Sequence, residues 1–426
     1  MNNEQLKHDA LRYHEMPVPG KLTVSSLKPC STKEELSLAY TPGVAYPCLE
    51  IAANPHDAYR YTNKKNLVAV ISNGTAVLGL GDIGAAASKP VMEGKGVLFK
   101  RFAGIDVYDI EINENDPEKL IAIVRSLEPT FGGINLEDIK APECFHIEQT
   151  LKKEMNIPVF HDDQHGTAII VGAGLLNALE LNGKDIASIN VVFSGAGAAG
   201  TSCATFLTQL GVQQRNIFMF DKEGPLTAQR ATSLTPEQAR FAHNTYSSLA
   251  QAMTDADVFI GVSVGGLVTT AMVKSMRTDP VVFALANPNP EIGYDEACAC
   301  RSDIIMATGR SDYPNQINNV LGFPFLFRGA LDVSASAITE NMKIAASHAL
   351  ARLAKEPVPA YVKDIYGANL TFGRDYIIPK PFDHRVLIEE SAAVAQAAIN
   401  DGVAREIIDM NEYKIKLTEL ARRLHT

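Results

Sequence analysis

A glycine-rich turn between an apolar segment and a helical one constrains the fold of this chain more than any other feature. Residues 189–194 read INVVFS, which is typical of a buried strand, and Gly195, Gly197 and Gly200 follow directly. The next residues, TSCATFLTQL, continue as a helix that ends at Gly211. A strand, turn and helix of this kind present backbone N–H groups to a pyrophosphate. The segment therefore predicts a βαβ unit that binds a dinucleotide.

A second match to the same pattern, from Gly79 to Gly84, competes for this role. An acidic residue lies about 20 residues beyond each match, at Asp106 and at Asp221, so the partner acid does not decide. Pro90 follows the earlier match where a phosphate-capping helix would be in its interior, and proline there removes a hydrogen bond and creates a clash. We therefore predict a compromised helix and a substrate-side loop at the earlier match. The cofactor is assigned to the later one, at residues Gly195, Ala196, Gly197, Ala198, Ala199 and Gly200.

Apolar segments continue beyond the later match with room for a helix or long turn between them, at residues 216–221, 256–263, 280–287 and 303–309. This spacing predicts a doubly wound, Rossmann-type sheet rather than an isolated tight turn. Asp221 ends the first of these strands, where a carboxylate binds a ribose hydroxyl and favours NAD. Lys222 follows directly and would meet the 2′-phosphate of NADP; the alternative is that Asp221 caps a turn and Lys222 is a solvated surface charge. The sequence leaves the choice between NADP and NAD open.

The residues before residue 163 have the pattern of a second α/β unit. Apolar segments alternate with helical ones, the former at residues 67–72, 96–112 and 156–162 and the latter at 117–128 and 148–155. Near the other end, Ala-rich helical segments at 329–354 and 391–403 are expected to pack back on this unit.

A chain of 426 residues exceeds what one hydrophobic core usually serves. We therefore predict an α/β fold with two domains. Residues 1–162 plus 320–426 would form a discontinuous α/β substrate and metal domain, and residues 163–319 a Rossmann-type doubly wound dinucleotide-binding domain.

Charge and composition exclude several classes of function. A net charge of -10 argues against nucleic acid as a partner, because phosphate binding needs a concentrated basic face. No apolar run reaches the roughly 18 residues of a membrane helix, and the first residues lack the apolar core of a signal peptide. The six cysteines are sparse and irregularly spaced, as expected of free thiols. A cytoplasmic protein that acts on small metabolites is the prediction.

Acidic residues in two short segments suggest a metal site. Glu137 and Asp138 lie in INLEDIK, and Asp163 lies in VFHDDQH. Two carboxylates within about 4 Å repel by roughly 4 kcal/mol at an effective dielectric near 20, so three that converge need a cation between them. Carboxylate oxygens suit Mg²⁺ or Mn²⁺. Asp162 should point away from Asp163 and pair with a lysine. The alternative is that the first pair caps a helix and the second forms a turn.

Lys95 is the candidate base. It lies between two glycines and before an apolar segment taken as a strand, where partial burial would lower its pKa. Tyr40 in LAYTPGV is a weaker candidate, because most tyrosines only pack. Asn287, Asn318 and Asn319 follow predicted strands, where amides bind a substrate carboxylate or the nicotinamide, although turns before proline and glycine explain them equally well.

With these residues in place, the chain closely resembles malic enzymes, specifically the malic-enzyme portion of bacterial NADP-dependent enzymes that carry a phosphotransacetylase-like domain behind it. The resemblance covers nearly the whole chain. It is carried by SLAYTPGVAYPCLEI, the segment from NLVAVIS to GVLFK, GGINLEDIKAPECF, IPVFHDDQHGTA, FSGAGAAG, ALANPNPE, TGRSDYPNQINNVLGFPF and YIIPKPFD.

The resemblance implies oxidative decarboxylation of (S)-malate to pyruvate and CO₂ with reduction of NADP or NAD, and decarboxylation of oxaloacetate. Lys95 would be the general base, Tyr40 the general acid and Asp162 the residue that orients Lys95. The carboxylates of Glu137, Asp138 and Asp163 would hold Mg²⁺ or Mn²⁺. The asparagines Asn287 and Asn319 would lie at the malate or nicotinamide end.

Some features stay open at this stage. Larger eukaryotic members bind the substrate carboxylate with an arginine near the first glycine motif, but TAVLGLGDIG contains none. A homodimer or higher homo-oligomer is the expected assembly. The chain ends where its two-domain relatives would continue, so it is either a fragment or a short enzyme. The rival functions are a metal-independent dehydrogenase acting on amino acids and a silent regulatory module that binds a nucleotide.

Overall fold

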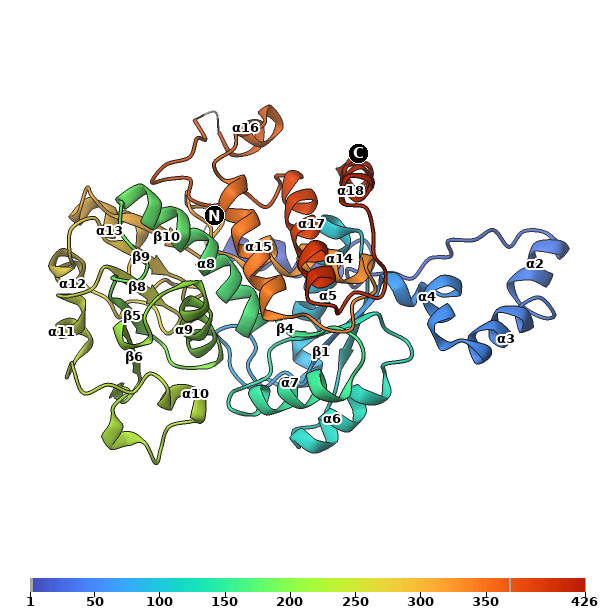
Figure 1. Ribbon diagram of the computed structural model, residues 1–426, viewed down its shortest axis with the longest axis horizontal. Coiled ribbons are helices and arrows are strands. Elements are labelled where there is room, and N and C mark those ends of the chain that lie inside the picture. The colour runs from blue at the N-terminus through green and yellow to red at the C-terminus, as the bar shows by residue number, and fades with distance from the viewer. Residues whose placement is uncertain (1–2, 368, 426) are drawn as a thin grey trace.

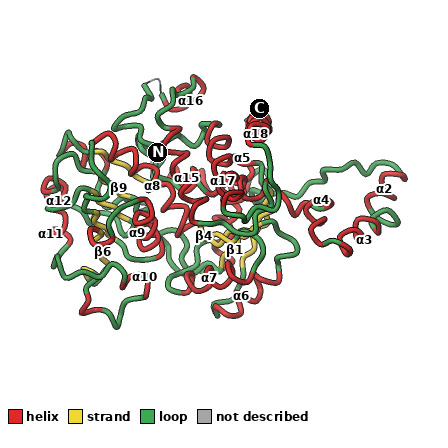
Figure 2. The backbone as a smooth tube through the Cα atoms, in the orientation of Figure 1, coloured by secondary structure: helices red, strands yellow, loops and turns green. Residues whose placement is uncertain are grey.

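The structure, a computed structural model, describes residues 3–367 and 369–425. It contains two sheets that lie side by side, with helices around both (Figures 1 and 2). The two-domain α/β fold class predicted from the sequence is confirmed.

The first sheet has four parallel strands in the order β2-β1-β3-β4. Its strands are β1 (Leu67–Ser72), β2 (Asp106–Glu111), β3 (Gly133–Leu136) and β4 (Val159–His161). The connecting helices are α5 (Ala85–Ala103), α6 (Pro117–Ser126) and α7 (Glu143–Glu154). Every residue of β1 is buried, because the strand lies in the middle of a sheet covered on both faces. The carboxyl ends of β3 and β4 are neighbours, since Leu136 pairs with His161.

The second sheet has six strands in the order β10-β9-β8-β5-β6-β7, all parallel except the short antiparallel pair β6 and β7. Its strands are β5 (Val191–Ser194), β6 (Ile217–Asp221), β7 (Gly224–Pro225), β8 (Val258–Gly261), β9 (Val281–Ala284) and β10 (Ile305–Thr308). Its helices are α9 (Ala198–Leu210), α10 (Pro236–Ala239), α11 (Leu249–Met253), α12 (Thr270–Ser275) and α13 (Tyr294–Cys300). The chain direction across the sheet reverses between β5 and β8, which is where doubly wound sheets bind dinucleotides.

One long helix joins the two sheets. Helix α8 (Asp162–Asn182) begins where β4 ends and packs along α9, and most of its residues are buried. Gly183 ends it in the left-handed region, as the Asn-Gly pair predicts. Five C-terminal helices follow: α14 (Phe323–Asp332), α15 (Glu340–Leu353), α16 (Ala360–Tyr366), α17 (Arg385–Asn400) and α18 (Met410–His425). Helices α14 and α18 pack on α5, α15 packs on α8, and α17 packs on α14, α15 and α18. Short 3-10 helices lie at Pro55–Asp57, Asn63–Asn66, Gln214–Asn216, Ala228–Arg230 and Asn319–Leu321.

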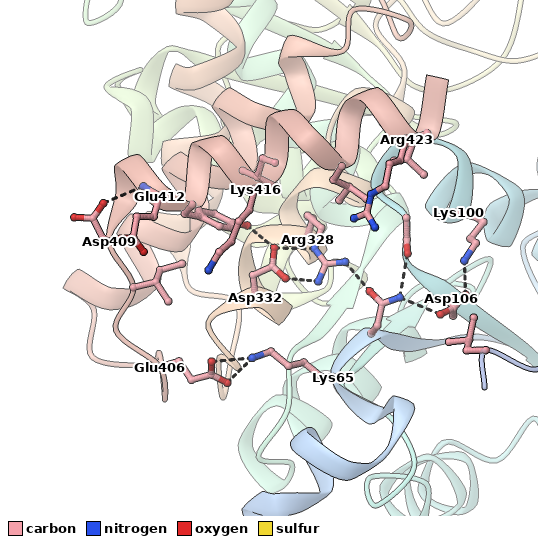
Figure 3. A pocket seen from close by; sticks show the side chains of 18 of the residues that line it. Lys65, Lys100, Asp106, Arg328, Asp332, Glu406, Asp409, Glu412, Lys416 and Arg423 are labelled. Carbon is pink, nitrogen blue, oxygen red and sulfur yellow. Dashed lines mark hydrogen bonds and ion pairs between the residues drawn. The ribbon is translucent and has the colours of Figure 1, made fainter. Parts of the chain in front are cut away.

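Helix α18 is fastened by charged groups around a cavity of about 810 Å³ (Figure 3). The buried Arg328 pairs with Asp332, and the Tyr413 hydroxyl donates to the same carboxylate at 2.7 Å. At the rim, Lys65 pairs with Glu406 at 2.6 Å. Several charges of this cavity therefore pair with one another, and the Tyr413 hydroxyl attaches the C-terminal helix to α14.

The N-terminal helices are less buried than the C-terminal ones. They are α1 (Asn3–Glu15), α2 (Lys33–Ala39), α3 (Ala45–Ala53) and α4 (Ala58–Tyr61). Residues 33–53, here called the arm, project away from both sheets at the right of Figure 1, and none of them is buried. The arm exposes large apolar side chains to solvent, namely Leu36, Leu38, Tyr40, Val44, Tyr46 and Leu49.

Three predictions about secondary structure are wrong. The segment 96–112 is not one strand, because α5 continues to Ala103 and β2 begins only at Asp106. Nor does Pro90 compromise the helix after the first glycine motif: α5 runs through it, since the carbonyl that proline leaves without a partner belongs to the exposed Ala86. The segment 329–354 is likewise two helices, α14 and α15, rather than one.

The free thiols predicted from cysteine spacing agree with the structure. All six cysteines are free thiols. Among the described residues, no helix combines the length and apolar character needed to cross a membrane.

Candidate functional site

Three carboxylates meet at the carboxyl edge of the first sheet. Glu137 and Asp138 follow β3, and Asp163 lies in the first turn of α8, directly after β4. Because β3 and β4 are adjacent and parallel, these segments meet although they are distant in sequence. One oxygen of each side chain lies within 4.8 Å of the others. Asp138 adopts a left-handed φ of 54°, and its N–H donates to Asp163 Oδ2 at 2.8 Å.

Electrostatics in this cluster favour a bound cation. Burial and the neighbouring Asp163 carboxylate raise the pKa of Asp138 to about 7. Burial also raises the pKa of Glu137 well above its usual range, although Lys95 opposes the shift. Asp138 Oδ2 is buried and accepts no hydrogen bond from the described residues. Buried, mutually repelling oxygens of this kind fit a hard divalent ion such as Mg²⁺ or Mn²⁺.

This repulsion predicts that the order of melting temperatures of the wild type and Asp138→Asn reverses when a metal ion binds. In a chelator at pH 8, Asp138→Asn should melt at a higher temperature than the wild type, because Asp138 is ionised above its pKa of about 7 and repels its neighbours. Asparagine also tolerates the left-handed φ. With saturating Mn²⁺ the order should reverse, because ligand binding stabilises only the protein that keeps the site. Equal Mn²⁺-induced shifts in the two proteins, measured by calorimetry, would contradict the metal assignment.

Lys95 lies inside helix α5, and its ammonium lies 2.8 Å from Glu137 Oε1 and 2.7 Å from Asp162 Oδ2. The same ammonium lies 4.4 Å from the centre of the Phe323 ring. The prediction that burial lowers its pKa is wrong for this arrangement. Burial does act in that direction, but the Asp162 and Glu137 carboxylates outweigh it and raise the pKa of Lys95 above its ordinary value.

Asp162 is held from two further sides. Asn319 Nδ2 donates to Asp162 Oδ2 at 3.0 Å, and the side-chain oxygen Asn319 Oδ1 accepts from the Thr167 hydroxyl. Gly166 makes room for the carboxylate, because a Cβ atom at this position would lie 1.9 Å from Asp162 Oδ1. Asn318 has a local role instead: its side-chain oxygen accepts from Val320 N–H and caps a 3-10 helix.

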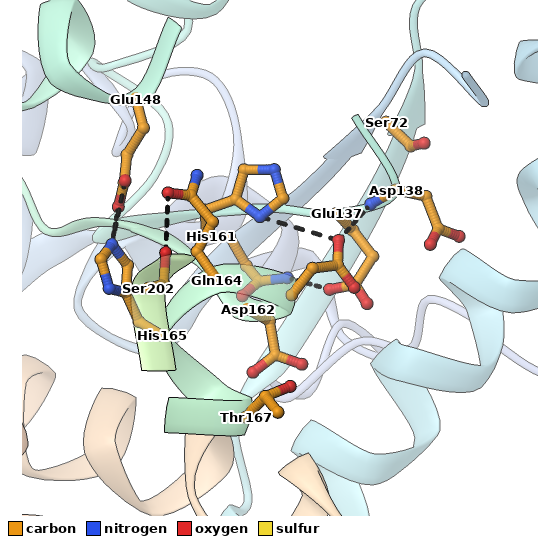
Figure 4. Close-up of polar contacts among 12 residues, drawn as sticks. Ser72, Glu137, Asp138, Glu148, His161, Asp162, Gln164, His165, Thr167 and Ser202 are labelled. Carbon is orange, nitrogen blue, oxygen red and sulfur yellow. Dashed lines mark hydrogen bonds and ion pairs between the residues drawn. The ribbon is translucent and has the colours of Figure 1, made fainter. Parts of the chain in front are cut away.

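The first turn of α8 also carries a separate set of polar contacts among residues that sequence reasoning missed (Figure 4). His165 Nε2 lies 2.9 Å from a Glu148 oxygen on α7, and Lys343 of α15 lies 3.2 Å from His165 Nδ1. Because an ammonium only donates, Nδ1 accepts and Nε2 carries the proton given to Glu148. Burial alone would raise the pKa of Glu148, but His165 and Lys152 outweigh it and hold it well below its usual range. The sequence offered one signal, a run of polar residues entering an apolar helix.

The predicted cofactor turn has the form that dinucleotides require. Gly195 has φ of 108°, and a Cβ there would lie 2.6 Å from the Val262 carbonyl oxygen. A Cβ at Gly200 would lie 2.0 Å from the Gly195 carbonyl oxygen. Gly197 precedes the first residue of α9, so Ala198 and Ala199 begin that helix. A cavity of about 540 Å³ adjoins the turn and is lined by residues that include Gly195, Ala196, Gly197, Asp221 and Lys222.

Asp221 is already engaged by a residue that the sequence did not signal. Arg230 lies nine residues further along the chain, and its two terminal nitrogens contact the two Asp221 oxygens at 3.0 and 2.5 Å. Asp221 Oδ1 also accepts from Glu223 N–H at 2.8 Å, which is the turn that the sequence offered as the alternative. Hydrogen bonds to Arg230 outweigh the effect of burial and lower the pKa of Asp221.

Asn287 connects the two sheets. Asn287 follows β9. A Cβ atom added at Gly309, which follows β10, would lie 3.2 Å from Asn287 Nδ2. A Cβ at Gly79, in the first glycine motif, would lie 2.9 Å from the Asn287 carbonyl oxygen. The first glycine motif therefore contacts the loop after β9 in the second sheet.

Tyr40 is the one predicted side chain that lies apart from the others. It ends α2 on the arm and is 70% exposed. The arm projects away from the strands and helices that carry Lys95 and the carboxylate cluster (Figure 1). A single copy of the chain therefore does not bring Tyr40 to Lys95.

Comparison with known families agrees with this geometry. Residues 19–152, which include the first sheet up to α7, match the family "Malic enzyme, N-terminal domain". Residues 164–366, which include the second sheet, match the family "Malic enzyme, NAD binding domain".

Individual proteins give the same result. The chain is 56% identical to the NADP-dependent malic enzyme of Haemophilus influenzae over 98% of its own length and 56% of that protein. It thus spans little more than half the length of this relative. An NADP-dependent malic enzyme of Halomonas elongata is also 56% identical, over 93% of this chain and 94% of that one. The crystal structure of a Pyrococcus horikoshii malic enzyme superposes with a TM-score of 0.89 at 44% identity, covering 98% and 97% of the two chains. Site geometry, fold and sequence together show that the chain belongs to the malic enzyme family.

Proposed function

We propose that this chain catalyses the oxidative decarboxylation of (S)-malate to pyruvate and CO₂, with reduction of NADP or NAD, in the presence of Mg²⁺ or Mn²⁺. One observation carries the proposal. A buried lysine, Lys95, contacts both Glu137 of the carboxylate cluster and Asp162, beside a dinucleotide fold. An amino-acid dehydrogenase needs no such cluster, and a regulatory module needs no buried lysine within it.

The residues divide the reaction between them. A divalent ion held by Glu137, Asp138 and Asp163 supplies a Lewis acid for developing negative charge, and the nicotinamide supplies the hydride acceptor. Lys95 takes the proton of the malate C2 hydroxyl as the hydride leaves C2. Asp162 and Asn319 hold Lys95 in position through the contacts described above. Loss of CO₂ then leaves an enolate, and Tyr40 gives a proton to C3 to form pyruvate.

The direct test is an assay of (S)-malate oxidation by the absorbance of reduced nicotinamide. With Mn²⁺ and NADP, reduction should proceed and pyruvate should accumulate in equal amount. Excess chelator should abolish both, and added Mn²⁺ should restore them. Reduction that persists in chelator would favour the metal-independent dehydrogenase. A folded protein that binds nucleotide but reduces neither cofactor would favour the regulatory module.

We propose further that the protein acts as a homo-oligomer and that the arm of one copy brings Tyr40 to the Lys95 of another. The exposed apolar side chains of the arm support this, because a soluble monomer rarely leaves such a group uncovered. The projection of the arm supports it as well, since Tyr40 needs a second copy to meet a substrate bound at Lys95 (Figure 1).

We propose the domain boundaries that the sequence predicts: residues 1–162 with 320–426 form one domain, and residues 163–319 form the other. Packing of α14 on α5 supports the return of the C-terminal segment to the first domain. The Phe99 ring contacts the rings of Phe323 and Phe327 at centroid distances of 4.7 and 5.4 Å.

Lys222 should set the preference for NADP. It lines the cofactor cavity beside Asp221, whose carboxylate pairs with Arg230, so the Lys222 ammonium can meet a 2′-phosphate with little opposition from that carboxylate. Lys222→Ala should raise KM for NADP about tenfold, the worth of one charged contact, and leave KM for NAD nearly unchanged. Glu223→Ala, at the next position, is the matched control and should not weaken NADP binding. An unchanged KM for NADP would make Lys222 a solvated surface charge, and equal increases for both cofactors would place it at a part that they share.

A further inference from the structure

His161 is buried without a partner. Its relative exposure is 0%, and neither ring nitrogen makes a hydrogen bond among the described residues. A buried polar group in this state costs roughly 1–3 kcal/mol, and such groups are rare in folded proteins. The unpaired ring therefore reduces stability where it lies, and a leucine of similar size would remove two buried nitrogens that make no hydrogen bond.

The position of the ring is fixed by the sheet. His161 is the last residue of β4 and pairs with Leu136 of β3. Its backbone is therefore held within the first sheet. Its Nδ1 lies 3.6 Å from Asp163 Oδ2. That separation is contact rather than a hydrogen bond. Figure 4 shows the ring beside Glu137 and the segment that carries Asp138.

The two oxygens of Asp163 are not equivalent. Oδ2 accepts the Asp138 N–H at 2.8 Å and is also the oxygen nearest to the His161 ring. A second donor on Oδ2 would hold the carboxylate in one rotamer and leave Oδ1 as the oxygen that faces the cluster. Carboxylates that bind metals are commonly held by outer donors in this way, and loss of such a donor typically costs 10–100-fold in metal affinity.

We propose that His161 is a positioning residue for the cation site, donating Nδ1–H to Asp163 Oδ2 when a divalent ion occupies the carboxylate cluster. The inference rests on the proposed function, since it assigns an outer contact to the same cation. It explains why a polar ring occupies a place where an apolar side chain would be more stable. His161 acts through Asp163 and touches neither substrate nor cofactor.

The test compares three variants by Mn²⁺ affinity, read from the electron paramagnetic resonance of free Mn²⁺, and by melting temperature in chelator. His161→Leu removes the donor. We expect a melting temperature in chelator equal to or above that of the wild type, and a Kd for Mn²⁺ raised about 10–100-fold. NADPH binding, followed by its fluorescence, should not change. His161→Asn keeps an N–H donor on a shorter side chain and should recover part of the affinity.

Glu390 provides the matched control. It is 1% exposed on α17, a helix that supplies no residue to the cluster, and neither of its oxygens accepts a hydrogen bond among the described residues. Glu390→Met should therefore raise the melting temperature as His161→Leu does, with no change in Mn²⁺ affinity. A Kd for His161→Leu within about twofold of the wild type would overturn the proposal, because it would show a histidine that only fills the core.

Wild-type protein supplies an independent measurement if His161→Leu does not fold. The ring N–H proton of ¹⁵N-labelled His161 should move downfield on addition of Mg²⁺, as a hydrogen bond to a carboxylate forms. A resonance that Mg²⁺ leaves unchanged would overturn the proposal. These outcomes separate from failure of the proposed function: wild-type protein that binds no Mn²⁺ refutes the cation site itself, whereas an unaffected variant of a Mn²⁺-binding wild type refutes only the role of His161.

Discussion

Lys95→Ala should lower kcat for malate oxidation by about 10²–10⁴-fold, the contribution typical of a positioned general base. The variant loses the one described ammonium that contacts both Glu137 and Asp162. In the wild type, the Asp162 and Glu137 carboxylates raise the pKa of Lys95. A cation bound among the carboxylates offsets this effect, so Lys95 loses its proton most readily when the metal site is filled. Steady-state kinetics with saturating Mn²⁺ and NADP measure the effect, which should appear in kcat rather than in KM for the cofactor.

Lys100→Ala is the control on the same helix. Lys100 lies in the last turn of α5, and its side chain is 59% exposed and pairs with Asp106 at 2.7 Å. Its replacement removes the same charge from the same element but should leave kcat within about twofold of the wild type, as for exposed ion pairs generally. The base assignment fails if Lys95→Ala retains a tenth or more of the wild-type kcat. A tenfold loss of kcat corresponds to a rise of about 1.4 kcal/mol in the activation free energy.

Mixing two inactive variants should restore activity. Tyr40→Phe removes the proposed acid and Lys95→Ala the proposed base, so each homo-oligomer alone should be nearly inactive. If Tyr40 serves a neighbouring copy, a mixed pair contains one site with both residues intact and one with neither. Random re-pairing of equal amounts into dimers should therefore recover about a quarter of wild-type activity. The measurement is malate-dependent reduction of NADP after the two variants are dissociated together and reassociated.

A mixture in which Tyr40 serves its own copy cannot recover, because every site then carries one defect. Reassociated wild type shows how much activity survives the procedure, and each variant taken through it alone sets the background. Tyr46→Phe mixed with Lys95→Ala is the matched control for an exposed arm tyrosine. This mixture should be about half active, since the Tyr46→Phe copies keep both proposed catalytic groups. Recovery no greater than the background would place Tyr40 and Lys95 in one copy, or Tyr40 outside the reaction.

Local patterns determined much of the fold. Apart from the short β7, the strands from β5 to β10 lie in the segments that alternating apolar and turn-forming residues predict, because strand length and turn chemistry depend on neighbours in sequence. The same reasoning failed at residues 96–112, where an apolar run is compatible with either a helix or a strand and only packing against β1 and β2 decides. Pro90 was misleading for a related reason, since the cost of a helical proline depends on whether the freed carbonyl reaches water.

The chemistry of the site was determined in part. Residue types alone indicated that Glu137, Asp138 and Asp163 would need a cation, because carboxylates repel wherever they converge. That they converge, and that Asp162 turns to Lys95, was decided by the adjacency of β3 and β4 and by contacts between residues 67 positions apart. Arg230 against Asp221, and His161 without a partner beside Asp163, had no local signal at all. The sequence determined most of the elements and the residue types of the site, since these depend on neighbouring residues. The tertiary structure alone decided which side chains meet, since that depends on how distant segments pack.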